Sequence, residues 1–322
     1  MKTIHWPCAG VLALALVSAS HAQTSYPNRP VRLVVPSSAG GGSDITARMI
    51  APKLAERLGQ QVIVDNRAGA GTMIGGEVVA KAPADGYTLL LGISTLATNP
   101  AIYRKVPYNA LTDFAPITLV LSAPNILVVH PSLPVRNVKE LIWFAGARPG
   151  ELNFGSAGTG TNPHLSMELF LSMAKLRMVH IPYKGSAPAM TDLLGGQVAT
   201  IMATMLTAIP HVRSGRLRAL GVTSSQRTAV ARDVPTIAES GVPGYEAVQW
   251  YGLLAPANTP KEVVTRLHRD MTAILQSSEI KERFAADGGD PGGNSPEEFA
   301  RYIRSETEKW ARVVKIAGLK PE

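Results

Sequence analysis

The stretch from Val31 to Arg48, VRLVVPSSAGGGSDITAR, joins an apolar run, a glycine-rich turn and the start of a helix. The valines and leucine of residues 31–35 are typical of a buried strand, and Pro36 ends it because proline has no N–H to donate to a sheet. Ser43 and Asp44, which follow three glycines, favour a helix N-terminus. The free backbone N–H groups and the helix dipole at such a corner attract anions. This order predicts an α/β fold with an anion-binding corner.

The three consecutive glycines, Gly40 to Gly42, leave the kind of anion open. The dinucleotide fingerprint requires G-x-G-x-x-G, and the P-loop requires a lysine after its glycines, so neither pattern is matched. A plain strand-to-helix turn, in which glycine serves only the backbone conformation, is the alternative to an anion site.

The first hundred residues continue the alternation of strands and helices. We predict strands over residues 31–35, 61–65 and 87–91, and helices over residues 44–58 and 74–81. A β-α-β-α-β order implies a parallel sheet, with ligands bound outside the carboxyl ends of its strands. Ser37 and Ser38 emerge there after the first strand, and Ser94 and Thr95 emerge after the third.

The rest of the chain predicts a second α/β unit and two connections to the first. The expected crossings are the extended residues 115–129, interrupted at Ala123-Pro124-Asn125, and the extended residues 244–254. Between them we expect strands over 152–154, 179–182, 198–202 and 217–222, and helices over 138–147, 163–173, 187–195 and 208–215. Residues from Pro260 onward are mostly helical and end in a charged amphipathic helix over about 296–317.

This order predicts two Rossmann-like lobes joined by two crossing strands, with a cleft between them. Residues 23–123, completed by about 251–295, form the first lobe, and residues 124–250 form the second. Residues 296–322 form a C-terminal helix that the sequence assigns to neither lobe. Each lobe directs one helix N-terminus rich in glycine, serine and threonine at the cleft, over residues 38–44 and 156–164.

Residues 1–22 have the features of a secretory signal peptide, with Lys2 in a basic start, an uncharged apolar run and a cleavage site before Gln23. The apolar run of about eleven residues falls short of the ~20 needed to span a bilayer, so we expect export to the periplasm. Cys8, the only cysteine, lies in this peptide. The mature chain is therefore expected to have no disulfide and no thiolate metal site.

The formal net charge of +8 comes from scattered Lys and Arg, without a basic run. This distribution favours a small anionic ligand over nucleic acid as partner. The spacing of the seven histidines predicts no metal site, and no motif indicates a cofactor.

Several long motifs occur in series over essentially the whole mature chain: VPSSAGGGSDITAR, VIVDNRAGAGTMIGGEVVAKAPADGYTLLLG, YNALTDFAPITLV, NFGSAGTGTNPHL, HIPYKGSAPAMTDLLGGQV and YGLLAPANTPKEVV. In this order they resemble the periplasmic solute-binding receptors of tripartite tricarboxylate transporters, the Bug family. The resemblance implies a periplasmic-binding-protein (Venus flytrap) fold that closes on a small organic carboxylate. It also implies a monomer that delivers this ligand to integral membrane permease subunits and has no enzymatic activity.

The candidate ligand-binding residues combine this resemblance with the predicted strand ends. In the first lobe they are Ser37, Ser38, Ala39, Gly40, Gly41, Asp44, Ser94 and Thr95, and in the second lobe Ser156, Ala157, Gly158, Thr159, Gly160, Thr161, His164 and Thr204. The resemblance implies that the two glycine-rich loops hold a carboxylate through backbone N–H groups and ordered waters.

Two departures from the family pattern bear on the ligand. Ser37 and Ser38 stand where relatives usually have an aromatic residue and a proline, which implies a smaller and wetter pocket floor. Ala199 and Ala203 stand where relatives often have acidic residues, so we expect simple carboxylic acids to bind better than amino acids. Asp44 is either a helix N-cap or a partner for a cationic group on the ligand.

Other interpretations stay open. Ser156 and His164 invite comparison with a hydrolase, but GSAG is not G-x-S-x-G and no acidic partner is evident. A ligand-loaded sensor that acts on a membrane signalling partner uses the same cleft, and the sequence does not separate it from a transport receptor. Tyr183 and Lys184 belong either to the lobe structure or to the cleft.

Overall fold

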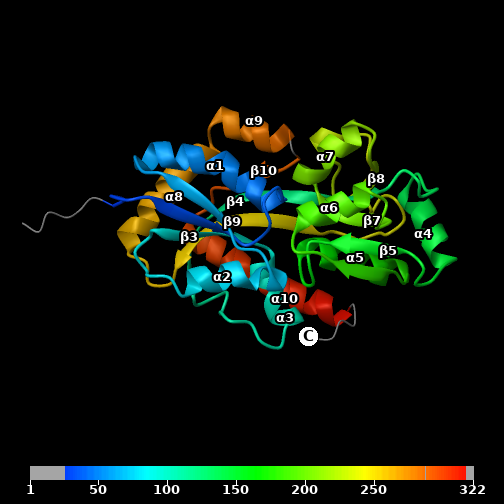
Figure 1. Ribbon diagram of the computed structural model, residues 1–322, viewed down its shortest axis with the longest axis horizontal. Helices are drawn as coiled ribbons and strands as arrows, with labels where there is room; N and C mark the ends of the chain where they lie inside the picture. Colours follow the sequence, from blue (N-terminus) through cyan, green and yellow to red (C-terminus); the bar gives the residue numbers. More distant parts are fainter. Residues whose placement is uncertain (1–25, 287, 317–322) are drawn as a thin grey trace, which may run out of the picture.

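The computed structural model describes residues 26–286 and 288–316 and has an α/β architecture with one long, mixed sheet (Figure 1). In chain order the elements are β1 (Val31–Val35), α1 (Gly42–Leu58), β2 (Val62–Asn66), η1 (Ala70–Thr72), α2 (Met73–Ala80), β3 (Thr88–Ile93), α3 (Thr95–Ile102), β4 (Phe114–Val129), α4 (Val138–Gly146), β5 (Asn153–Ser156), α5 (Asn162–Ala174), β6 (Val179–Pro182), α6 (Ser186–Leu194), β7 (Thr200–Thr204), α7 (Met205–Arg213), β8 (Arg218–Val222), η2 (Ala229–Ala231), β9 (Val248–Pro256), α8 (Lys261–Leu275), α9 (Ser278–Ala286), β10 (Asp290–Pro291) and α10 (Pro296–Ile316).

The sheet order is β2-β1-β3-β9-β4-β7-β5-β6, with β8 and β10 paired to β4. We call β2, β1 and β3 the first half of the sheet, and β7, β5, β6 and β8 the second half. The strands of the first half are parallel, with Val31 opposite Val62 and Leu33 opposite Leu89. The predicted parallel β-α-β-α-β order is therefore confirmed.

The long strands β4 and β9 run antiparallel to each other across the middle of the molecule and connect the two halves (Figure 1). β4 continues through Pro124, so the predicted interruption at Ala123-Pro124-Asn125 is wrong. Pro124 lies opposite Val248 of β9, and from Asn125 onward the strand pairs with β7 and β8 instead. The proline therefore lies where β4 changes partner strands. Its missing N–H does not break a continuous run of hydrogen bonds between two strands at this position.

Each half has its own apolar core. In the first, Leu33, Ile50 and Leu267 join β1 to α1 and α8; in the second, Phe154 and Phe170 join β5 to α5. The sequence analysis missed α3, which begins directly after β3, and α7 begins three residues earlier than expected. The lobe boundaries proposed from the sequence stay a prediction.

The C-terminal helix α10 contributes to the cores on both sides of the crossing strands. Phe299 and Ile303 pack with Trp250 in one cluster, whereas Trp310 and Val314 pack in the core of the second half. The helix thus belongs to both parts, which explains why the sequence assigned it to neither.

The predicted signal peptide lies outside the described residues. Over residues 26–286 and 288–316, no helix combines the length and the apolar character needed to cross a membrane.

Candidate functional site

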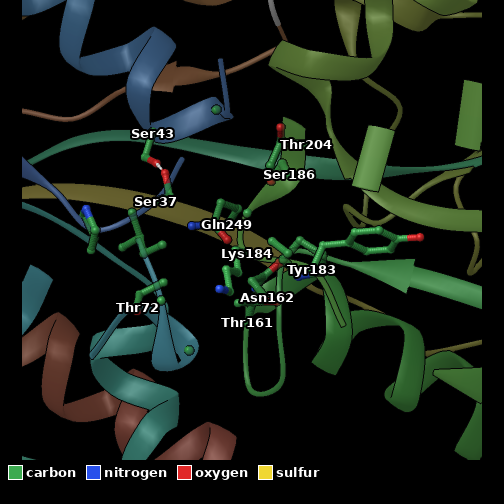
Figure 2. A pocket seen from close by; sticks show the side chains of 18 of the residues that line it. Ser37, Ser43, Thr72, Thr161, Asn162, Tyr183, Lys184, Ser186, Thr204 and Gln249 are labelled. Carbon is green, nitrogen blue, oxygen red and sulfur yellow. Dashed lines mark hydrogen bonds between the residues drawn. The ribbon is translucent and has the colours of Figure 1, made fainter. Parts of the chain in front are cut away.

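A cavity lies between the two halves of the sheet, at the carboxyl end of β1 and beside β9 (Figure 2). The space open to the centres of water molecules is about 70 Å³, and a single buried water needs roughly 10–15 Å³ by the same measure. The residues that line it are Pro36, Ser37, Gly42, Ser43, Gly69, Ala70, Gly71, Thr72, Ile93, Ala157, Thr161, Asn162, Pro163, Tyr183, Lys184, Gly185, Ser186, Thr204, Gln249 and Tyr251.

Five helices direct their N-termini at this cavity. The first residues or N-caps of α1, α2, α5, α6 and α7 all line it. The N-caps of α1 and α6 are glycines without a side chain, and the threonine N-caps of α2, α5 and α7 make no capping hydrogen bond within the described structure. The orphan backbone N–H groups and the positive ends of the helix dipoles therefore favour a negatively charged occupant.

α1 begins unusually close to the opposite wall. A Cβ atom on Gly42 would lie 2.6 Å from the hydroxyl of Tyr251 and 2.9 Å from Oγ1 of Thr204. Tyr251 belongs to the crossing strand β9, and Thr204 belongs to the second half. Only glycine allows the N-terminus of α1 to approach both groups, because any side chain at residue 42 would collide with them.

The walls supply many neutral hydrogen-bonding groups. Hydroxyls come from both halves, and those of Ser37 and Ser43 hydrogen-bond each other (Figure 2). The amide of Asn162 donates to the carbonyl of Val248 on β9, and Oε1 of Gln249 accepts from Ser94. Lys184 is the one charged side chain among the lining residues. Over the part of the chain that the structure describes, the cavity is thus polar, has no acidic side chain in its walls, and suits an anion.

Among the residues predicted in the first lobe, only Ser37 lines the cavity. Ser38, Gly40 and Gly41 instead meet the start of α6, where Cβ atoms on the two glycines would lie 3.6 Å from Ala187 and 3.9 Å from Ser186. Ala39 is exposed on the same turn. The predicted loop therefore reaches the second half, but mostly beside the cavity rather than in its wall.

Asp44, Ser94 and Thr95 are buried behind the wall. Asp44 accepts hydrogen bonds from the backbone N–H of Gly40 at 2.8 Å and from Arg48 at 3.0 Å. Burial opposes ionisation of Asp44, but these bonds outweigh it and hold the pKa of its carboxyl below the usual value. Thr95 hydrogen-bonds Thr72 at 2.5 Å. Asp44 is thus engaged by its own helix and does not line the cavity.

Among the residues predicted in the second lobe, Ala157, Thr161 and Thr204 line the cavity. The other N–H groups of this loop are largely used within it: Gly158 donates to Ser156 Oγ, and Gly160 donates to Nδ1 of His164. The carbonyl of Thr159 accepts from Tyr103 of the first half. The loop therefore shapes the wall and joins the halves. The N–H groups of Gly158 and Gly160 already have hydrogen-bond partners and are not free to bind a ligand.

The serine–histidine pair differs from the one considered in the sequence. Ser156 Oγ lies 2.6 Å from Nε2 of His180, and the rings of His164 and His180 stack with centroids 4.0 Å apart. Burial, followed by the neighbouring His164, lowers the pKa of His180 to about 3. Ser156 is 1 % exposed and does not line the cavity. A catalytic serine has to be exposed to its substrate, and Ser156 is not, so the structure does not support a hydrolase site at this residue.

Several lining residues were not among the predicted ones, notably Thr72, Asn162, Ser186, Gln249 and Tyr251. Ser186 had a local signal, because Gly185-Ser186 precedes the predicted helix as a capping pair would. Gln249 and Tyr251 lie two positions apart on the crossing strand β9, so their side chains share one face. No local sequence motif marks either residue as part of a site. Within the described residues, no group of His, Cys, Asp and Glu is arranged to hold a metal ion.

The chain matches a model of the family described as "Tripartite tricarboxylate transporter family receptor" over residues 46–319. Among curated relatives, Protein BugT of Bordetella pertussis is 40% identical over 311 residues, which cover 96% of this chain and 95% of BugT.

Two solved structures share the fold closely. The R. palustris protein Rpa4515 with adipate has a TM-score of 0.90 and 40% identity, covering 92% of this chain and 100% of Rpa4515. The periplasmic binding protein BugD has a TM-score of 0.90 and 36% identity, covering 92% of this chain and 100% of BugD. The predicted periplasmic-binding-protein fold is confirmed, and the chain belongs to the family of tripartite tricarboxylate transporter receptors, which are periplasmic solute-binding proteins.

Proposed function

We propose that this protein captures a small organic carboxylate in the cavity between its two halves and delivers it to the integral membrane permease of a tripartite transporter. The observation that carries the proposal is the meeting of five helix N-termini without side-chain caps in a cavity whose described lining residues include no acidic side chain. The adipate bound to Rpa4515 supports the same ligand class.

The binding energy must come mainly from direct hydrogen bonds. A helix dipole stabilises an anion by roughly 0.3–1 kcal/mol, whereas micromolar affinity requires about 8 kcal/mol. Charge-assisted hydrogen bonds contribute about 1.5–3 kcal/mol each. In the hydroxyl pair of Ser37 and Ser43 one proton is left to donate, whereas the Thr161 hydroxyl donates to the carbonyl of Gly158. Backbone N–H groups at the helix starts add further donors on both sides of the cavity.

Ligand capture is expected to accompany closure, because the residues that line the cavity come from different parts of the fold. Ser37 and Gly42 belong to the first half, Thr161 and Thr204 to the second, and Gln249 to a crossing strand. A carboxylate that contacts both walls binds the closed arrangement better than an open one and so shifts the population toward it. Export through the predicted signal peptide brings the receptor to the periplasm, where the permease is accessible.

The proposal is tested by incubating the exported protein with adipate and following both protein and acid. At a ligand concentration of about 100 times Kd, binding adds about 2.7 kcal/mol to the free energy of unfolding and raises Tm by several degrees. A receptor returns the acid unchanged, as read by mass spectrometry of the mixture. Chemical conversion of the acid, or an unaltered Tm with adipate and with a panel of other small carboxylates, contradicts the proposal.

A further inference from the structure

Among the described residues that line the cavity, Lys184 is the one cationic side chain, and the others are neutral. It is exposed, and the structure gives it no ion-pair or hydrogen-bond partner among the described residues. In contrast, Arg48 near the same corner is paired with Asp44 at 3.0 Å. A lysine beside an anion cavity and without an acidic neighbour is available to a ligand.

The backbone around Lys184 is fixed from both sides. Tyr183 donates its hydroxyl to Asp192 of α6 at 2.6 Å and its backbone N–H to the carbonyl of Ser156 at 3.1 Å. In Figure 2 its ring extends away from the cavity. On the other side, Gly185 has a φ of +128° and packs so tightly against Ser38 of the first half that no side chain fits there.

These contacts place Lys184 where the two halves meet, at the start of α6. Ser186, the first residue of that helix, also lines the cavity, and α6 has no side-chain cap. The ammonium group is carried on a flexible stem of four carbons, so it can reach a charge that extends out of the narrow cavity. A ligand held by its first carboxylate at the helix N-termini would meet this ammonium with its other end.

We infer that Lys184 is a specificity-determining residue that pairs with a second carboxylate, so that the protein selects dicarboxylates over monocarboxylates of equal chain length. The inference rests on the proposed function and refines its ligand class. An amine at the second end would meet a like charge instead, because none of the described lining residues is acidic and could receive it.

The test compares ligands that differ only in the second carboxylate: succinate with butanoate, and adipate with hexanoate. Affinities are measured by titration calorimetry for the wild type, Lys184→Gln, Lys184→Arg and a control, Lys281→Gln. Lys281 is an exposed lysine of α9 away from the cavity. Loss of one charge-assisted hydrogen bond corresponds to about a tenfold loss of affinity or more.

We expect the wild type to prefer at least one dicarboxylate over its partner by about tenfold or more, and Lys184→Gln to abolish this preference without weakening the monocarboxylate. Lys184→Arg should retain the preference, and Lys281→Gln should match the wild type. Equal binding of both members of each pair by the wild type, or an unaltered preference in Lys184→Gln, overturns the role of Lys184 and leaves carboxylate capture standing. Failure of the wild type to bind any of the four acids contradicts both.

Discussion

Thr98 of α3 donates a hydrogen bond of 2.7 Å to the carbonyl oxygen of Gly160, which lies in the loop before α5. Helix α3 follows β3 of the first half of the sheet, whereas the loop with Gly160 follows β5 of the second half, and Thr98 is fully buried. Tyr103, also near the end of α3, donates to the carbonyl of Thr159 in the same loop at 2.9 Å. The loop that forms one wall of the cavity is therefore held against the other half by hydroxyl groups.

Replacing Thr98 by Val should weaken ligand binding by about five- to tenfold, because one neutral hydrogen bond contributes ~1 kcal/mol and this one joins the two halves. Valine preserves the shape and removes only the donor. Small-angle scattering of the unliganded protein should report a larger radius of gyration than for the wild type, as the open form gains population.

Thr200→Val is the matched control, because Thr200 is also buried and donates at 2.8 Å to the carbonyl of Val128, but both residues lie on the second-half side of the crossing. It should lower Tm without altering affinity. Equal affinities for the two variants would mean that the Thr98 bond has no part in closure.

Thr204 is the N-cap of α7 and lines the cavity. Thr204→Asp should lower carboxylate affinity at least about a hundredfold, since two like charges ~4 Å apart repel by about 4 kcal/mol near a protein surface. Aspartate is a good N-cap, so Tm should not fall substantially. Calorimetric titration with adipate, together with a thermal melt, measures both effects.

Thr204→Asn has nearly the same size and capping ability as the aspartate variant but no charge. We expect its affinity to stay within a few fold of the wild type. A loss as large as that of Thr204→Asp would show that shape rather than charge excludes the ligand.

Succinate should bind more tightly than aspartate, which differs from it by an ammonium group. Asp44 is held by Arg48 and by the N–H of Gly40, and no residue that the structure describes in the cavity wall is acidic. The ammonium would therefore lose water without gaining a counter-charge. Competition between the two acids in one titration measures the difference. Tighter binding of aspartate contradicts this expectation and would assign Asp44 a direct role.

His180 should make folding stability depend on pH below neutrality. Its pKa is lowered to about 3 in the folded protein by burial and by the adjacent His164, whereas an unfolded histidine has a pKa of about 6.5. Between these values only the unfolded chain binds the proton, so stability is full above pH ~6.5 and falls as the pH decreases. We expect this residue to remove about 1–2 kcal/mol between pH 6.5 and 5.

Urea unfolding of the wild type and His180→Gln at several pH values isolates this contribution. Glutamine can still hydrogen-bond Ser156 but does not titrate, so its profile should be flatter over that range. Parallel profiles for the wild type and His180→Gln would refute the lowered pKa.

The sequence predicted the fold well because its strong signals are local. The apolar run before Pro36 and the glycines before α1 specify a strand and a helix start within a few residues of where the structure has them. The crossing strand β4 was harder, since Pro124 is a breaker by its own chemistry and is accommodated only by the exchange of strand partners around it. This change of strand partners depends on the tertiary structure and cannot be predicted from the neighbouring sequence.

The cavity was predicted only in part for a similar reason. Ser37, Ala157, Thr161 and Thr204 were among the candidates drawn from the family resemblance and the predicted strand ends, and they line the cavity. Gly158 was a candidate as a free N–H donor, but its N–H is taken by Ser156. Asn162 and Gln249 line the cavity because α5 and β9 come together in the folded chain. This proximity cannot be predicted from a short stretch of sequence.

Helix α10 inserts Phe299 and Ile303 into one core and Trp310 and Val314 into another. A straight separation of the two halves would remove at least one of these pairs from its cluster and expose large apolar side chains to water. A rotation of the two halves that keeps both ends of this helix packed in their clusters exposes the least apolar surface. Solute entry should therefore proceed by a limited pivot whose range is set by the C-terminal helix.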